Sequence, residues 1–267
     1  MDKRLIAGRF AKARDTYEAQ AEAQRLIAGH MASLLRRAFP KGEGERVKKL
    51  AEIGCGTGIY SRMLLQGFRP ERLWLNDLCP EMADRLEGVM RDGAGRVSFT
   101  PGDAERIRLP EECDAVTSCS TFQWFADLPA FLHRCSRSLR PGGILAFSTF
   151  GPENLREIRR LTGHGLPYPD TASLRRMLEA DYTLLHLGED ILSLPFATPR
   201  HVLVHLRQTG VTGTGKHGWT RGRLEAFCEA YVRQFPAADG GGVTLTYHPV
   251  YVVAQKPGDG KDNVTHY

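Results

Sequence analysis

The sequence predicts an α/β protein built on a doubly wound, mostly parallel sheet. Short apolar, β-branched runs alternate with amphipathic patterns over residues 47–150, as expected for successive strand–helix units. The first run, Val47–Ile53, ends in three glycines on alternate positions, and a helical pattern begins at Ile59. A strand, a glycine turn and a helix in this order form the first unit of a nucleotide-binding sheet. The 267 residues suffice for one large α/β domain with a cap.

The segment before the first strand predicts a helical arm added to the sheet. Over residues 3–39, apolar side chains recur at near-helical spacing among Arg, Lys, Glu and Gln. The run Pro40–Gly44 breaks this pattern. We therefore expect an N-terminal helical arm within residues 1–44, in which Phe10 serves packing.

The glycine turn indicates which nucleotide the sheet would bind. The dinucleotide fingerprint Gly-x-Gly-x-x-Gly would place its third glycine at position 59, whereas this chain has Gly54, Gly56, Gly58 and then Ile59. Glu52, just before the turn, would repel a pyrophosphate but attract a cation or a hydrogen-bond donor. S-adenosylmethionine lacks phosphate and carries a sulfonium and an ammonium group, so both departures favour it over NAD or FAD.

The rest of the core predicts strand–helix units in order. We expect helices over 59–68, 80–90 and 127–139, strands over 72–76, 96–100, 113–120 and 144–150, and a turn over 140–143. Asp77 ends the second strand near the ~20-residue spacing at which an acid meets a ribose diol, and its two oxygens can accept from both hydroxyls. The alternative for Asp77 is a helix N-cap. The loop after the fourth strand should border the ligand crevice, which would place Phe122, Gln123 and Trp124 beside the reacting group.

Several motifs together resemble one large enzyme class. The Glu-x-Gly-x-Gly-x-Gly pattern of residues 52–58 resembles motif I of the class I S-adenosylmethionine-dependent methyltransferases. Gly102-Asp103-Ala104 resembles the segment in which that family's acid faces the adenine amine, and Leu139–Leu145 resembles the approach to its fifth strand. The resemblance implies a Rossmann-like sheet whose last strand is antiparallel, with S-adenosylmethionine as co-substrate. It implies a binding site made of Glu52, Gly54, Cys55, Gly56, Gly58, Asp77, Leu78, Asp103, Ala104, Ser120 and Phe122.

The second half of the chain predicts a cap over this site. We expect helices over 154–161, 174–178, 198–209 and 220–235, a sixth strand over 182–194, and a last strand over 243–256. Residues 195–242 are too long for a plain sheet connection, so we expect a helical cap insertion there. The core would then comprise residues 45–194 and the last core strand 243–256, and the polar tail 257–267 would be disordered.

Two segments narrow the resemblance. Phe147–Ile158 and Leu203–Gly210 are similar to the malonyl-[acyl-carrier protein] O-methyltransferases of biotin biosynthesis, as are the arm with Phe10 and Tyr17 and the pair Gln123-Trp124. This resemblance implies methyl transfer to the free carboxylate of a malonyl thioester on acyl carrier protein, giving the methyl ester that primes pimeloyl synthesis. The chain departs from the family pattern at two positions: Cys79 replaces the usual Ser, and Arg207 stands where Lys is common.

Such an acceptor would need positioning rather than acid–base catalysis, because a carboxylate is already ionised near neutral pH. Our first candidate for holding it is Arg207, because a guanidinium can pair bidentately with a carboxylate; a helix C-terminal charge is the alternative. Tyr17, Gln123 and Trp124 are the other positioning candidates. An acidic carrier protein could dock on a basic face, for which the candidates are Arg156, Arg159, Arg160, Arg175, Arg176 and Arg200; a solvated face is the alternative for each.

Other functions stay open at this point. A trans-aconitate-type O-methyltransferase would accept a small free acid, a quinone C-methyltransferase would need a base beside the fourth strand, and a non-catalytic S-adenosylmethionine-binding module would keep the same acceptors. The six cysteines include no Cys-x-x-Cys pair, so we expect no metal site. The net charge of +5 is no nucleic-acid signature, and the sequence has neither a membrane-length apolar run nor a signal-peptide core. We expect a cytoplasmic protein without nucleic-acid or membrane partners.

Overall fold

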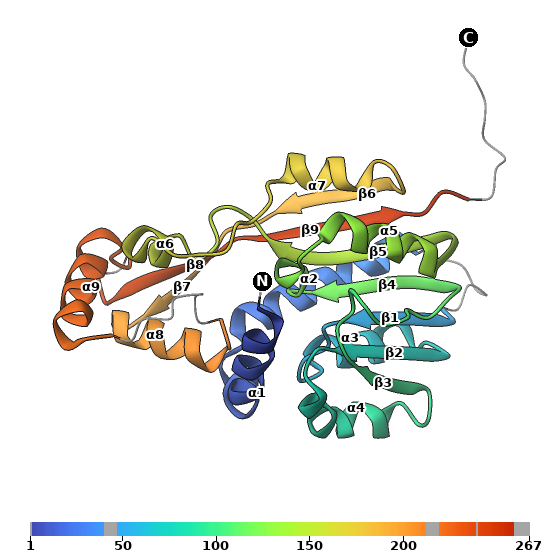
Figure 1. The fold of residues 1–267 in the computed structure, drawn as a ribbon, viewed down its shortest axis with the longest axis horizontal. Helices are drawn as coiled ribbons and strands as arrows, with labels where there is room; N and C mark the ends of the chain where they lie inside the picture. Colours follow the sequence, from blue (N-terminus) through green and yellow to red (C-terminus); the bar gives the residue numbers. More distant parts are fainter. Residues whose placement is uncertain (1, 40–46, 212–218, 239, 259–267) are drawn as a thin grey trace, which may run out of the picture.

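The computed structural model describes residues 2–39, 47–211, 219–238 and 240–258, which contain a seven-stranded sheet of order β3-β2-β1-β4-β5-β9-β6 (Figure 1). Strands β1 to β5 pair in parallel, and β9 runs antiparallel to both β5 and β6. The strands are β1 Lys49–Ile53, β2 Arg72–Asp77, β3 Val97–Pro101, β4 Cys113–Cys119, β5 Leu139–Phe150, β6 Thr183–Glu189 and β9 Pro249–Gln255. The predicted class, a mostly parallel sheet with an antiparallel last strand, is confirmed.

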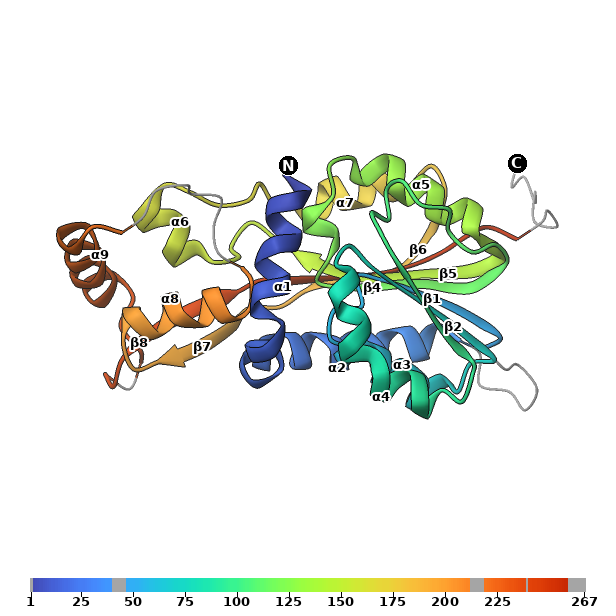
Figure 2. The ribbon, with the colours of Figure 1, turned by 60° about the horizontal axis from the view of Figure 1, so that its bottom comes forward.

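Helices cover both faces of this sheet (Figure 2). One face carries α2 Glu22–Ala38, α3 Ile59–Phe68 and α4 Glu87–Asp92, and the other carries α5 Leu128–Ser138 and α7 Thr171–Leu178. Along α2, Ile27, Met31 and Leu35 recur at helical spacing and are fully buried against the sheet. Burying each such side chain stabilises the fold by about 1.5–3 kcal/mol. The segment 80–90, expected as one helix, is a 3₁₀ turn, η1 Pro80–Leu86, followed by α4.

The N-terminal arm consists of two helices rather than the single one expected. Helix α1 spans Lys3–Gln20, and α2 follows after Ala21, whose φ of −85° and ψ of 43° break the helix. No Gly or Pro marks this break. Helix α2 packs along one face of the sheet, whereas α1 lies between the sheet and α8 Pro199–Gln208 (Figures 1 and 2). The Thr16 hydroxyl donates to the Gln208 carbonyl at 3.2 Å, so α1 joins the core to the second half of the chain.

A separate two-stranded sheet forms outside the core from β7 Leu192–Phe196 and β8 Val243–Tyr247. It lies beside α8, α6 Arg156–Thr162 and α9 Arg221–Gln234 (Figure 1). The expectation of single strands over 182–194 and 243–256 was therefore wrong: each range holds two strands that pair in different sheets. The chain leaves the core sheet at His248, whose backbone N–H donates to the Asn154 side chain at 3.2 Å. The division into arm, core and cap stays a proposal, and β7 and β8 join both sides of the proposed insertion.

Some expectations differ locally or lie outside the described residues. The turn expected over 140–143 belongs to β5, where Gly142 adopts a φ of +71° beside a register shift between β4 and β5. The helix break at 40–44, residues 212–218 of the expected cap insertion, and residues 259–267 of the tail 257–267 that was expected to be disordered fall outside the described residues. None of the helices described is long and apolar enough to cross a membrane.

Candidate active site

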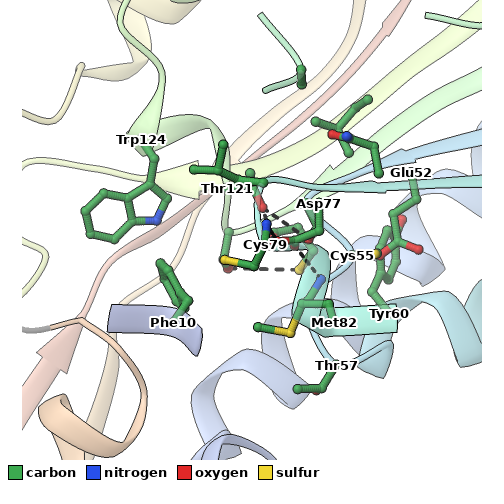
Figure 3. Close-up of a pocket in the computed structure, with 18 of the residues that line it drawn as sticks. Phe10, Glu52, Cys55, Thr57, Tyr60, Asp77, Cys79, Met82, Thr121 and Trp124 are labelled. Carbon is green, nitrogen blue, oxygen red and sulfur yellow. Dashed lines mark hydrogen bonds between the residues drawn. The ribbon is translucent and has the colours of Figure 1, made fainter. Parts of the chain in front are cut away.

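A cavity lies at the carboxyl ends of β1 to β4, and α1 closes one side of it (Figure 3). This is where open α/β sheets bind ligands. Eleven of the fifteen predicted site residues line it: Tyr17, Glu52, Gly54, Cys55, Gly56, Asp77, Leu78, Asp103, Ala104, Ser120 and Trp124. The four that are not among its lining residues are Gly58, Phe122, Gln123 and Arg207.

Each glycine of the turn after β1 has a different reason to lack a side chain. All three have φ between +52° and +85°, the left-handed region that favours glycine. A Cβ on Gly54 would lie 2.2 Å from Thr121 Oγ1 in the loop after β4, so this glycine lets the two loops meet. Gly58 precedes α3, and a Cβ on it would lie 3.0 Å from the side chains of Leu86 and Val89. At Gly56 a Cβ would meet no protein atom within 4 Å, so this position leaves space for a ligand in the cavity.

Glu52 is a buried carboxyl group without a complete set of partners. It is the penultimate residue of β1 and is 1% exposed, and its Oε2 has no hydrogen-bond partner among the described residues. Burial raises the pKa of Glu52 to about 8; the neighbouring Ser61 hydroxyl lowers this pKa, and the Asp77 carboxylate raises it further. An unsatisfied buried acceptor is costly. A cationic hydrogen-bond donor in the cavity would satisfy it, which fits the ammonium group of S-adenosylmethionine.

Asp77 braces the glycine turn from the end of β2. Its Oδ2 accepts from the Gly56 N–H and its Oδ1 from the Cys79 N–H, both at 2.8 Å. Burial raises the pKa of Asp77, and these two backbone donors oppose that shift. Each carboxylate oxygen keeps a second lone pair, so the group can still accept from a ribose diol. Asn76 beside it donates to the Thr100 and Gly102 carbonyls at 2.9 Å, which fixes the loop after β3.

Asp103 receives a cation from the arm that the sequence did not indicate. The Lys3 ammonium on α1 lies 2.5 Å from Asp103 Oδ1 and also pairs with Glu105. Glu105 in turn accepts from the backbone N–H groups of Ala126 and Asp127. Lys3 therefore connects α1 to the loops after both β3 and β4.

Of the predicted residues in the loop after β4, Ser120 and Trp124 line the cavity, whereas Phe122 and Gln123 do not. Ser120 holds a φ of +55°, and its carbonyl accepts from Gln123 Nε2 at 2.6 Å. Phe122 points into the core, where its ring contacts the ring of Phe147. Phe122 and Gln123 thus support the loop, and ligand contact by either side chain stays a prediction. Trp124 faces the cavity, as Figure 3 shows.

The arm supplies the opposite wall. Tyr17 lines the cavity, and burial raises the pKa of its phenol. Gln24 on α2 is 7% exposed, and its Oε1 has no hydrogen-bond partner within the described chain. Arg207 is exposed on α8, so its role as a carboxylate anchor stays a prediction without support from the cavity.

The lining residues outside the predicted set include Lys3, Ile6, Phe10, Arg14, Gln24, Thr57, Tyr60, Asn76, Cys79, Met82, Cys119 and Thr121. Thr57 and Asn76 adjoin motif residues, and their positions alone could have indicated them. The arm residues carry no such signal, because periodicity does not say which face of an added helix meets the site.

Comparisons with known proteins agree with this geometry. A family model described as a methyltransferase domain matches residues 51–147. The malonyl-[acyl-carrier protein] O-methyltransferase of Bacteroides helcogenes is 50% identical, with 96% of this chain and 99% of that protein covered. The solved BH2331 protein of Bacillus halodurans aligns with a TM-score of 0.63 at 17% identity, covering 85% of this chain and 98% of that one. A Haemonchus contortus phosphoethanolamine N-methyltransferase in complex with S-adenosyl-L-methionine aligns with a TM-score of 0.56 at 18% identity, covering 92% and 57%.

The sheet order, the glycine turn after β1 and the cavity with its buried acceptors define a class I methyltransferase. The likeness to the Bacteroides enzyme extends over nearly the whole of both chains. The chain belongs to the malonyl-[acyl-carrier protein] O-methyltransferase family.

Proposed function

We propose that the protein transfers a methyl group from S-adenosylmethionine to the free carboxylate of a malonyl thioester on acyl carrier protein. The observation that carries this proposal is the 50% identity, along nearly the full length, to a relative of that name. Methylation removes the negative charge of the malonyl group. The uncharged ester suits the apolar pockets of fatty-acid elongation enzymes, and so can prime the pimeloyl chain of biotin.

The cavity residues would divide the work of holding the co-substrate. When bound, S-adenosylmethionine supplies a methyl group on a positively charged sulfur. Glu52 would accept from the ammonium group, Asp77 from the ribose and Asp103 from the adenine amine, and Gly56 would allow close approach of the ligand. Lys3 shares the Asp103 carboxylate, so α1 would close over the adenine end.

The acceptor would need no acid–base catalysis from the protein. The malonyl carboxylate is ionised near neutral pH, so no proton has to be removed. No histidine lines this cavity in the described part of the chain, in keeping with such a nucleophile. Tyr17 and Trp124, from opposite walls, would position the acceptor and exclude water from the transfer.

An acidic carrier protein could bind to exposed arginines in the second half of the chain. Arg160 on α6, Arg175 on α7 and Arg200 on α8 are exposed. Arg156 is less available, because its guanidinium lies 3.5 Å from Glu153 and 3.7 Å from Glu157. We propose the exposed arginines as the docking cations.

Mass spectrometry of the carrier protein tests this function. Malonyl-acyl carrier protein incubated with enzyme and S-adenosylmethionine should gain the mass of one methyl group, and acetyl-acyl carrier protein should not. Methylation of free aconitate or of a quinone, with none on the carrier protein, would reject the proposal in favour of those alternatives.

A further inference from the structure

A second cavity adjoins the first at Trp124, which lines both. Its walls come mainly from the segment that follows β5, with apolar side chains Leu155, Ile158 and Leu166. Because β4 and β5 are neighbours and end at the same edge of the sheet, this cavity extends the ligand crevice beyond Trp124.

Arg159 on α6 brings a positive charge into this second cavity. Its side chain is half-buried, and its guanidinium has no hydrogen bond or ion pair with the residues that the structure describes. The turn after α6 packs against its stem, because a Cβ on Gly165 would lie 2.3 Å from Arg159 Cγ. The charge lies near the Tyr168 phenol, whose pKa it lowers against the larger effect of burial. Arg159 is therefore held in place by packing while its charge stays unpaired.

The cations of the first cavity are already occupied. Lys3 pairs with Asp103 and Glu105. Arg14 lies 3.6 Å from Asp15 and 3.8 Å from Asp84. Among the lysines and arginines that line either cavity in the described chain, Arg159 is the one without a carboxylate partner.

We propose that Arg159 holds the free carboxylate of the acceptor, an inference that rests on the proposed function. A half-buried unpaired guanidinium is stabilised by a carboxylate that it can bind bidentately. Arg159 and Trp124 line the same cavity, so a carboxylate held by Arg159 would lie near Trp124, the side chain that also lines the first cavity. In the transfer, one carboxylate oxygen forms a bond to the methyl carbon while the carbon–sulfur bond breaks with its electron pair on sulfur, and no proton moves. The resulting ester has no charge, so its contact with Arg159 weakens and the product can leave.

This assignment differs from the one that the sequence favoured. Arg207 is exposed and lines neither cavity among the described residues. Arg160, next to Arg159 on the same helix, is also exposed and lines neither. Both therefore serve as controls that carry the same charge on the same half of the protein.

The test compares the binding of malonyl- and acetyl-acyl carrier protein to the complex of enzyme with S-adenosylhomocysteine, by fluorescence anisotropy. Wild type should prefer the malonyl form, and Arg159→Gln should bring the ratio of the two Kd values close to one. A charged hydrogen bond is worth about 1.5–3 kcal/mol, so we expect a roughly 10- to 150-fold loss of preference. Arg159→Lys should keep part of it, and Arg160→Gln and Arg207→Gln should keep all of it.

Two results would overturn the inference. If Arg159→Gln weakens both forms equally, the side chain contacts the carrier protein or its phosphate group and not the malonyl carboxylate. If neither Arg159 variant changes the ratio, the anchor lies elsewhere. Circular dichroism and S-adenosylhomocysteine affinity should both match wild type in a folded variant. If Arg159→Gln fails this control because it does not fold, the ratio measured for Arg159→Lys decides whether Arg159 is the anchor. A wild-type enzyme that methylates no malonyl-acyl carrier protein would instead reject the proposed function.

Discussion

The Phe10 ring meets the Trp124 indole edge-on, with ring centroids 5.8 Å apart and an angle of 85° between the planes. Phe10 belongs to the arm helix α1, and Trp124 belongs to the loop after β4. Phe10 also lies against Gly210 just beyond α8, where a Cβ would come within 2.8 Å of the Phe10 ring. One aromatic side chain therefore joins arm, core and cap at the wall of the cavity.

Phe10→Ala should loosen this closure. An edge-on aromatic pair contributes about 0.5–1.5 kcal/mol beyond its buried area. If the pair holds α1 over the ligand, S-adenosylhomocysteine should dissociate about 2- to 10-fold faster in stopped-flow measurements. Phe39→Ala breaks a similar pair with Phe68, at 5.9 Å and away from the cavity, and should leave the dissociation rate unchanged. Equal rates in all three proteins would show that the arm does not retain the ligand.

Two alanine substitutions in the glycine turn should separate folding from binding. Gly54→Ala would place its Cβ 2.2 Å from Thr121 Oγ1, so it should lower the free energy of unfolding by more than ~2 kcal/mol. Gly56→Ala meets no protein atom and should cost only the ~1–2 kcal/mol of its left-handed backbone. Its methyl group would stand in the ligand space, however, so S-adenosylmethionine affinity should fall at least ~10-fold. Chemical denaturation measures the effect on stability, and calorimetric titration measures the effect on binding. A Gly56→Ala protein that binds S-adenosylmethionine with normal affinity would show that Gly56 does not border the ligand.

The buried pair of Tyr247 and His205 links the small sheet to α8, with the Tyr247 hydroxyl 2.8 Å from His205 Nε2. Burial lowers the pKa of His205 and raises that of Tyr247, so both are neutral. Tyr247→Phe should cost about 1–3 kcal/mol in urea denaturation, because it leaves a buried nitrogen without a partner. The double variant with His205→Leu should be less destabilised than the sum of the single changes. Additive losses would mean that this hydrogen bond contributes little.

The fold was predictable wherever the pattern is local. The apolar periodicity and the glycines of residues 54–58 mark α3, whose bounds Ile59 and Phe68 agree with the prediction. The pairing of strands, in contrast, depends on residues far apart in the sequence. The pattern over 182–194 is correctly β-like, yet nothing in it says that its two halves pair in different sheets. The break at Ala21 has no breaker residue, because tertiary contacts of α1 and α2 decide it rather than propensity.

In the site, too, some residues were predictable from local sequence patterns and others depend on the tertiary fold. Glu52, Asp77 and Asp103 lie at or just beyond the carboxyl ends of successive parallel strands, so topology alone brings them to one edge of the sheet. Neighbouring residues of a short 3₁₀ turn point in different directions, so the sequence alone does not say that Trp124 lines the cavity while Phe122 packs against Phe147. Lys3 comes from an arm whose orientation no motif records.

Glu52 gives the ligand-free protein a pH dependence of stability. A carboxyl group whose pKa is raised to about 8 in the folded state keeps a proton that the unfolded chain loses above about pH 4.3. The folded state then binds more protons than the unfolded state, so the free energy of unfolding falls as the pH rises between these values. Glu52→Gln removes this loss and should raise the Tm at pH 8 by at least ~2 °C, with little change at pH 5. Asp77, whose pKa is also raised by burial, keeps its own contribution of the same sign in both proteins.

The same carboxyl group should make ligand binding release a proton. An ammonium group beside Glu52 favours the ionised form, so S-adenosylmethionine binding at pH 7 should release up to about one proton from the folded protein. Calorimetric titrations in buffers of different ionisation enthalpy measure that number directly. Glu52→Gln should abolish the release and weaken binding about 10- to 150-fold, because it loses a charged hydrogen bond. Asp103→Asn, at the adenine end, should weaken binding while leaving the proton release intact. Proton release that persists in Glu52→Gln would assign the titrating group to another residue of the cavity.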